Sequence, residues 1–250
     1  FWSLGIPIHQ IYGQSEASGP TTLETPRARR RGSVGRPLPG LALRIAEDGE
    51  VLVRGGNVFL GYFRDEAATR EAFDGEGWLR SGDVGHLDED GFLWITDRKK
   101  ELIVTAGGKK TGPALLEGLL QAIPPVAHAV VVGDGKPWIG ALLTLDPVAA
   151  AGWASERGLP FTGVADLARD PRLRDHLARA IATRINPRLA RFETIKRFVV
   201  LPVEFTTGEE GELTPTLKLR RRAAIRKYAE AIERLYAEPL DESVTACAER

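Results

Sequence analysis

Short runs of alternating apolar and polar residues dominate the first hundred positions of the chain. The runs at 41–45, 50–54 and 92–95 are typical of strands, and the turn sequence DEDG before the last run indicates a hairpin. A helical period occurs at 64–73. Residues 20–40 are rich in proline, glycine and arginine and have no period, which predicts a loop. We therefore expect the first part of the chain to be rich in β-structure.

The pattern changes after Asp97, where longer periodic segments alternate with strand-like runs. We expect helices at 114–123, 171–185 and 218–237 and strands at 127–132, 138–145 and 198–201. Helices and strands that interleave in this way predict an α+β fold class. We place a domain boundary at Asp97, between a first domain at 1–96 and a second at 97–250.

The composition excludes several classes of protein. The 34 Lys and Arg residues balance the 34 Asp and Glu residues, so no overall field attracts nucleic acid or an anionic membrane. A hydrophobic share of 43% is enough for a buried core. The single Cys247 excludes an internal disulfide, and no apolar run reaches the roughly 18 residues of a membrane span. The chain has no methionine and begins with Phe1, so we expect it to be a piece of a longer protein.

The first candidate site is the sequence YGQSE at 12–16, which we expect where a strand gives way to a loop. The ring of Tyr12 can stack on a base, and Gly13 lets the backbone approach a ligand. The hydroxyl of Ser15 can contact a phosphate, and the carboxylate of Glu16 can hold a divalent metal. A turn with a buried tyrosine is the structural alternative. Gly13-x-Ser15-x-Ala17 also resembles the nucleophile elbow of α/β-hydrolases, although alanine replaces the last glycine of that motif.

Two further segments carry charged residues beside glycines. Asp83 lies between two glycines near an expected strand end, where a carboxylate can accept hydrogen bonds from two vicinal hydroxyls or can cap a turn. The charged sequence DRKKE at 97–101 precedes an apolar run and then Gly107-Gly108-Lys109. This order suits a hinge with a basic element that faces an anion, and a solvated charged turn is the alternative.

The fourth segment is GELTPTLKLR at 211–220. Pro215 stiffens a loop that delivers Lys218 just before a basic helix. A mobile ammonium can neutralise charge that builds on a carboxylate or phosphate during acyl transfer, and a plain surface lysine is the alternative.

Several other kinds of site are missing from the sequence. It contains no P-loop, no dinucleotide-binding glycine motif and no Cys-x-x-Cys, and its four histidines have no metal-ligand spacing. Basic clusters occur at 27–31 and 220–222, but they lack interleaved aromatic residues. We therefore expect no nucleic-acid partner.

The four segments, in this order, resemble the adenylate-forming superfamily of acyl-CoA synthetases, adenylation domains and luciferases. The stretches at 130–146 and 211–221 are similar to the long-chain fatty acid CoA ligase branch. The resemblance implies that the chain holds the end of a large N-terminal domain, a β-rich subdomain, followed by a small α+β C-terminal domain. It also implies a reaction that uses ATP, Mg²⁺ and CoA to convert a fatty acid first to an acyl-adenylate and then to a thioester.

The resemblance assigns a role to each matching residue. Tyr12, Gly13, Ser15, Asp83 and Arg98 would bind the nucleotide, and Glu16 would hold Mg²⁺. Asp97 would be the hinge between the two half-reactions, with Lys100 as a polar contact beside it. Gly107, Gly108 and Lys109 would form the loop that approaches the catalytic centre in the thioester-forming state, and Lys218 would stabilise the transition state of adenylation.

The chain departs from the family pattern in two places. The family's phosphate-binding loop, which ends in Pro-Lys-Gly, is absent and is expected before Phe1, so we expect the 250-residue chain alone to be inactive. Lys110-Thr111-Gly112 stands where relatives often carry asparagine and small apolar residues. A non-catalytic adenylate-binding module, or an adenylate-forming enzyme for another carboxylate, is the alternative. We expect a cytoplasmic location with peripheral membrane contact through the acyl substrate.

Overall fold

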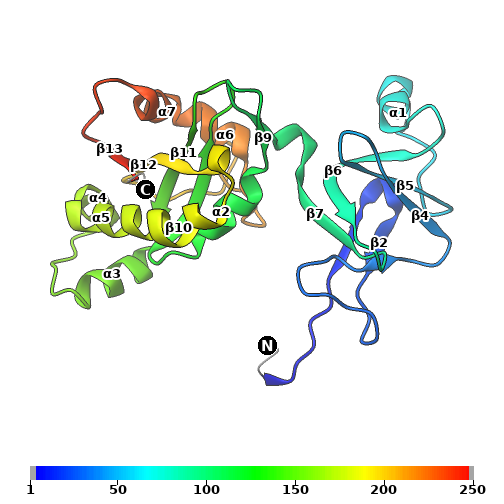
Figure 1. The fold of residues 1–250 in the computed structure, drawn as a ribbon, viewed down its shortest axis with the longest axis horizontal. Helices are drawn as coiled ribbons and strands as arrows, with labels where there is room; N and C mark the ends of the chain where they lie inside the picture. The colour runs from blue at the N-terminus through cyan, green and yellow to red at the C-terminus, as the bar shows by residue number, and fades with distance from the viewer. Residues whose placement is uncertain (1–3, 248–250) are drawn as a thin grey trace. The chain divides into compact units, whose positions relative to one another are not determined.

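The computed structural model describes residues 4–247, which divide into two compact units (Figure 1). The division falls between Glu101 and Leu102, a few residues after the expected boundary at Asp97. The first unit is rich in strands, and the second combines helices with one sheet. The α+β fold class is therefore confirmed.

The first unit contains two antiparallel sheets. The strands of the smaller sheet are β1 (Ile11–Gln14), β2 (Gly19–Leu23) and β3 (Arg36–Pro37). Those of the larger sheet are β4 (Leu41–Ile45), β5 (Glu50–Gly55), β6 (Leu79–Leu87) and β7 (Leu93–Arg98). Helix α1 (Glu66–Ala72) begins where the side chain of Asp65 accepts the amide hydrogen of Ala68. A small core of Ala17, Val53 and Leu79 holds this unit together.

Two expectations for this unit need correction. The segment 20–40 is not a loop throughout, because β2 and β3 lie in it and pair with each other. The motif at 12–16 lies where strand β1 ends and a 3-10 helix at Ser15–Ala17 begins, as expected. Asp83 lies inside β6 and not near its end. In each case the ladder partner, and not the hydrophobic period, decides the local structure.

The second unit is built on a four-stranded sheet in the order β10-β11-β12-β13. Its strands are β10 (Val126–Val132), β11 (Ile139–Leu145), β12 (Ile195–Val200) and β13 (Val244–Ala246). Strands β11 and β12 are parallel, so the chain crosses over between them through helices. Those helices are α3 (Pro147–Ser155), α4 (Val164–Arg169) and α5 (Pro171–Ala180), and α5 continues as a π-helical turn at Ile181–Ile185.

Alternate residues of this sheet pack into two separate hydrophobic cores. Ala129 and Val131 of β10 pack in the core that includes α2 (Pro113–Gln121) and α3 to α5. Val130 and Val132 pack in the second core, against α6 (Arg221–Lys227) and α7 (Ala229–Tyr236). The sheet is therefore buried on both faces, which explains its nearly continuous apolar strands.

The helix expected at 218–237 is two helices, because Tyr228 leaves the helical conformation between α6 and α7. Its ring stacks on Phe205 and its hydroxyl donates to Glu212. These tertiary contacts override a helical period that runs on without a break. Two short strands that the sequence did not reveal, β8 (Ile103–Val104) and β9 (Lys110–Thr111), form a small hairpin at the start of this unit.

No helix among residues 4–247 is both long enough and apolar enough to cross a membrane.

Candidate functional site

Three of the expected nucleotide-binding side chains meet in the first unit. The Tyr12 hydroxyl donates to Oδ2 of Asp83 at 2.7 Å, and Nε of Arg98 lies 2.8 Å from Oδ1 of the same carboxylate. Asp83 and Arg98 are direct partners in the β6–β7 ladder, and Tyr12 comes from β1. Asp83 is buried, whereas the Arg98 side chain is exposed. Both carboxylate oxygens of Asp83 therefore have a partner. Tyr12 is 71 residues away in the sequence, and Arg98 lies opposite Asp83 in the β6–β7 ladder.

The surroundings keep the Tyr12 hydroxyl protonated. Burial raises the pKa of Tyr12 well above its ordinary value, the hydrogen bond to Asp83 raises it further, and a hydrogen bond with Ser81 opposes this only in part. The backbone N–H of Asp83 donates to the Ser81 hydroxyl oxygen at 3.0 Å, which fixes the β6 backbone directly before the carboxylate. A buried carboxylate with a neutral donor and a cation beside it can accept hydrogen bonds from the vicinal hydroxyls of a sugar.

Gly13 is required by close packing of backbone. The β1–β2 pairing shifts its register between Tyr12 and Gly13, and a Cβ on Gly13 would lie 1.9 Å from the carbonyl oxygen of Gly19. A contact below 3.0 Å with backbone cannot be relieved by a side-chain rotation. The close approach of the two strands at this bulge therefore requires glycine at residue 13.

We expect Gly13→Ala to lower the free energy of unfolding by about 2 kcal/mol, because β1 must move away from β2 to admit the methyl group. Thermal unfolding followed by circular dichroism measures the change. Gly75→Ala is the matched control, since a Cβ at residue 75 meets nothing within 4 Å. Equal melting temperatures for the two variants would contradict the packing argument.

Ser15 and Glu16 lie in the 3-10 helix that follows β1. Oε1 of Glu16 accepts the Tyr62 hydroxyl at 2.8 Å, and this hydrogen bond, aided by burial, raises the pKa of Tyr62. Tyr62 was not among the expected site residues, and the Gly-Tyr pair at 61–62 was the only signal in the sequence. Glu16 is thus held at one oxygen, while Ser15 is exposed.

Glu16 has the chemistry of a magnesium ligand. Mg²⁺ is commonly held by one or two carboxylates together with substrate phosphates and waters, and a single hydrogen-bonded carboxylate fits that donor set. No group of three or more His, Cys, Asp or Glu residues that could form an all-protein metal cage occurs in the part of the chain that the structure describes. A Mg²⁺ ion at Glu16 would need further ligands, such as phosphate oxygens or waters.

Lys218 lies on an exposed turn of the second unit. The amide hydrogen of Lys218 is donated to the Thr214 hydroxyl oxygen at 3.0 Å, and the Thr214 N–H donates to the Lys218 carbonyl at 2.8 Å. Leu217 has a φ of 61°, a left-handed conformation that side-chain-bearing residues rarely adopt. The turn thus holds the Lys218 backbone firmly while its ammonium group projects from the surface.

A buried carboxylate, Glu212, organises the loop that carries Lys218. Glu212 is 0% exposed, and its Oε1 takes the Tyr228 hydroxyl and the Lys227 ammonium, each at 2.6 Å. Its Oε2 accepts the Thr206 backbone N–H at 3.1 Å. Burial opposes ionisation of Glu212, but these three partners outweigh it and lower the pKa to about 2. The sequence did not identify Glu212, since a glutamate beside a glycine is an ordinary surface pattern.

The expected hinge residues lie at the end of the first unit. Asp97 is buried in β7 opposite Val84, and its Oδ1 accepts the amide hydrogen of Arg98 at 2.7 Å. Lys100 is exposed in the 3-10 helix Lys99–Glu101. The structure places both residues directly before the division between the units, and their part in a hinge motion stays a prediction.

The glycine loop of the second unit is the turn between β8 and β9. Gly108 has a φ of 73°, and its N–H donates to the Thr105 carbonyl at 2.8 Å. The Thr105 N–H donates to the Lys109 carbonyl at 3.0 Å, so the turn is closed. Gly107 and Lys109 are exposed. The loop is accessible, and it belongs to the same unit as Lys218.

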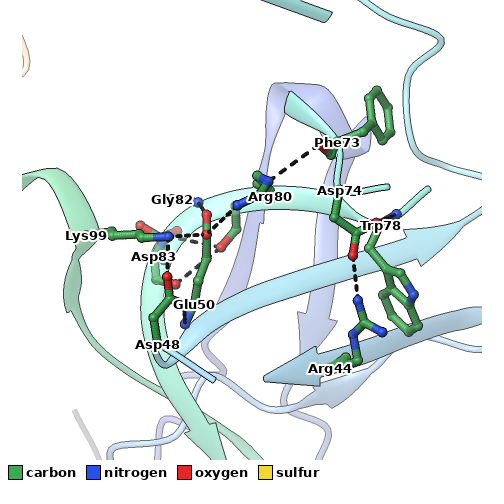
Figure 2. A network of polar contacts seen from close by, with 11 residues as sticks. Arg44, Asp48, Glu50, Phe73, Asp74, Trp78, Arg80, Gly82, Asp83 and Lys99 are labelled. Carbon is green, nitrogen blue, oxygen red and sulfur yellow. Dashed lines mark hydrogen bonds and ion pairs between the residues drawn. The ribbon is translucent and has the colours of Figure 1, made fainter. Parts of the chain in front are cut away.

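One more carboxylate that the sequence did not single out lies next to Asp83. Glu50, at the start of β5, is 3% exposed and accepts the N–H of Gly82 at 3.0 Å. Figure 2 shows its carboxylate between Gly82 and Lys99, with Asp48 below the lysine ammonium. Glu50 therefore connects the β6 backbone at Gly82 to the Lys99 side chain.

Comparison with known proteins identifies the class to which this fold and these residues belong. The AMP-binding enzyme C-terminal domain family matches residues 100–239, and the AMP-binding enzyme family matches residues 1–63. The first match covers more than half of the chain, so the chain belongs to the AMP-binding enzyme family. The resemblance to the adenylate-forming superfamily is confirmed.

The curated relatives include the long-chain-fatty-acid–CoA ligase FadD15 of Mycobacterium bovis, which is 50% identical over 93% of this chain. The long-chain-fatty-acid–CoA ligase ACSBG2 of Gallus gallus is 35% identical over 95% of the chain. These relatives support the expected fatty acid CoA ligase branch. The chain spans only 38% and 34% of their respective lengths, so the activity of the whole protein is a proposal.

Solved structures show the same fold. The o-succinylbenzoate coenzyme A synthetase MenE of Bacillus subtilis, in complex with AMP, has a TM-score of 0.64 and is 29% identical to this chain. The match covers 88% of this chain and 41% of MenE. Another structure of MenE contains ATP and a magnesium ion.

Proposed function

We propose that the protein containing this chain is an ATP-dependent long-chain fatty acid CoA ligase. The observation that carries the proposal is the Tyr12–Asp83–Arg98 cluster, in which a buried carboxylate of an AMP-binding family member is positioned by two polar partners. The 50% identity to a relative named as a long-chain-fatty-acid–CoA ligase supports the substrate class. Cytoplasmic location and peripheral membrane contact through the acyl substrate belong to the same proposal.

In the first half-reaction a fatty acid carboxylate oxygen attacks the α-phosphorus of ATP, and the bond from that phosphorus to pyrophosphate breaks. Asp83 would accept hydrogen bonds from the ribose hydroxyls, Tyr12 would place its ring against adenine, and Arg98 would orient the Asp83 carboxylate beside the same sugar. Gly13 would line the adenylate pocket, and the Ser15 hydroxyl would donate to a phosphate oxygen. The Lys218 ammonium would balance negative charge that develops at the phosphorus.

Mg²⁺ held by Glu16 together with the nucleotide phosphates would neutralise part of the phosphate charge. The Tyr62 hydroxyl donates to one oxygen of Glu16, which leaves the other oxygen to a ligand.

In the second half-reaction the CoA sulfur attacks the acyl carbon, and the bond from that carbon to AMP breaks, which gives the thioester. We place the loop of Gly107, Gly108 and Lys109 beside this step. Asp97 would be the hinge that exchanges the two half-reactions, and Lys100 would make a polar contact at the junction. These three assignments rest on the resemblance, and the exposure of the loop and of Lys100 supports them.

The proposal is tested with the full-length protein, oleate, ATP and CoA. We expect pyrophosphate release that depends on oleate, followed by oleoyl-CoA when CoA is added. Nucleotide binding without any product would instead indicate a non-catalytic adenylate-binding module. Turnover with another carboxylate, but not with oleate, would retain the chemistry and contradict the substrate class.

In the same protein, Asp83→Asn should raise the KM for ATP by roughly tenfold, because an amide presents one acceptor where the carboxylate presents two and attracts Arg98 less strongly. Steady-state kinetics at varied ATP measures the effect. Asp90→Asn is the matched control, since Asp90 pairs with Arg30 at the surface. An unchanged KM for ATP in Asp83→Asn would remove Asp83 from the nucleotide site.

A further inference from the structure

The Glu50 carboxylate joins two segments that are far apart in the sequence. Its Oε1 accepts the Gly82 N–H at 3.0 Å, and its Oε2 lies 2.7 Å from the Lys99 ammonium (Figure 2). Arg80 is the other cation near it, at 3.8 Å. Because Glu50 is 3% exposed, its carboxylate makes its polar contacts with these partners and little with water. Withdrawal of the Lys99 ammonium would leave a buried carboxylate with one distant cation.

The first of the two segments is the part of β6 that holds the candidate ribose-binding carboxylate. Gly82 has a φ of 72°, and it directly precedes Asp83. The Gly82 N–H is fixed by Glu50 and the Asp83 N–H by the Ser81 hydroxyl. Glu50 itself lies opposite Val84 in the β5–β6 ladder, and its side chain reaches back along β6 to Gly82. The position of Asp83 therefore depends on Glu50.

The second segment is the junction at the end of the first unit. Lys99 is the first residue of the 3-10 helix after β7, and its ammonium lies 2.6 Å from Oδ2 of Asp48 as well as 2.7 Å from Glu50. Its side chain is 35% exposed, so the ion pair is partly shielded from solvent. The preceding residue, Arg98, pairs with Asp83. Arg98 and Lys99 are thus consecutive cations at the junction, and they pair with Asp83 and Glu50 respectively. Glu50 also accepts the N–H of Gly82, the residue directly before Asp83.

We propose that Glu50 is a positioning residue that couples the junction to the nucleotide site, so that nucleotide binding at Asp83 and retention of Lys99 by Glu50 and Asp48 favour each other. The proposal rests on the nucleotide-binding role given above. A motion of the junction that withdraws Lys99 loosens strand β6 around Gly82 and lowers the affinity for AMP. By linkage, bound AMP strengthens the hold on Lys99 by the same factor. Lys99 does not touch the nucleotide in this account and acts only through Glu50.

The test is a comparison of variants of the full-length protein by calorimetric titration with AMP. We expect Lys99→Gln to weaken AMP binding about fivefold, within the usual range of coupling between sites. Asp48→Asn should weaken it less, because the lysine still has Glu50, and Lys99→Arg should restore most of the affinity. Amide hydrogen exchange of the peptide around Gly82 should be faster in Lys99→Gln than in the wild type.

Arg44→Gln is the matched control, because Arg44 is also held by two carboxylates of the first unit, Asp74 and Glu76. It should leave the affinity for AMP unchanged. The coupling is wrong if Lys99→Gln binds AMP as the wild type does, or if Arg44→Gln and Lys99→Gln lose affinity equally. A wild-type protein that does not bind AMP at all would overturn the proposed function itself, and with it this inference.

Discussion

Replacement of Lys218 by alanine is expected to slow acyl-adenylate formation by about 100-fold, which is the usual loss when a positioned donor to developing charge is removed. The turn fixes the lysine backbone through Thr214, so the variant should lose the ammonium and keep the loop. Thioester formation from supplied acyl-AMP and CoA should change by less than about threefold. Oleate-dependent pyrophosphate exchange and single-turnover thioester formation measure the two half-reactions separately.

Lys136→Ala serves as the control for this experiment, since Lys136 pairs with Glu233 at the surface of the same unit. Its two half-reactions should proceed as in the wild type. Equal losses in both half-reactions for Lys218→Ala would contradict a role specific to adenylation. Such a result would make Lys218 a residue of general substrate binding.

Glu212→Gln should lower the free energy of unfolding by about 3 kcal/mol at neutral pH, because a buried carboxylate with three partners loses its charge. Its amide oxygen can replace one acceptor, but its NH₂ group would face donors such as the Thr206 N–H. Urea unfolding followed by fluorescence measures the loss. Glu233→Gln, which breaks an exposed ion pair, should cost less than about 0.5 kcal/mol.

The pH dependence gives the same carboxylate a second signature. The pKa of Glu212 is about 2 in the folded protein against an ordinary value of 4.5, so the unfolded state binds the proton more readily. Its contribution to stability is therefore present above pH 4.5 and is lost as the pH falls toward 2. The difference in stability between wild type and Glu212→Gln should shrink over this range. A difference that stays constant down to pH 2 would show that the charge of Glu212 is not what stabilises the loop.

The sequence was sufficient where local pattern decides the structure. Alternation predicted β4 and β5, and the order of the motifs led to the right family and to residues that meet in space, such as Tyr12 and Asp83. Each of these signals lies within a short segment of chain. The chemical role of a residue, by contrast, could be inferred only through the resemblance.

The sequence was insufficient where partners come from distant segments. Glu50 is 49 residues from Lys99, and Tyr62 is 46 residues from Glu16, so no spacing rule connects them. The break at Tyr228 and the short strand β3 likewise depend on contacts outside their own segments. Buried carboxylates were the residues most easily missed, because glutamate beside glycine usually indicates a surface turn.

The hairpin turn between β10 and β11 also makes hydrogen bonds with the segment that leads into the glycine loop. The N–H of Gly135 donates to Val104, the carbonyl of Lys136 accepts from Ala106, and the Asp134 side chain accepts the Val104 N–H. A paired glycine in an exposed loop is often taken as a sign of free movement. Here the loop at 105–109 is held at its base by hydrogen bonds to a turn of the central sheet. If Gly107 and Gly108 approach a substrate as proposed, we expect the base of the loop to move together with this hairpin turn, and an insertion in the turn should displace the loop.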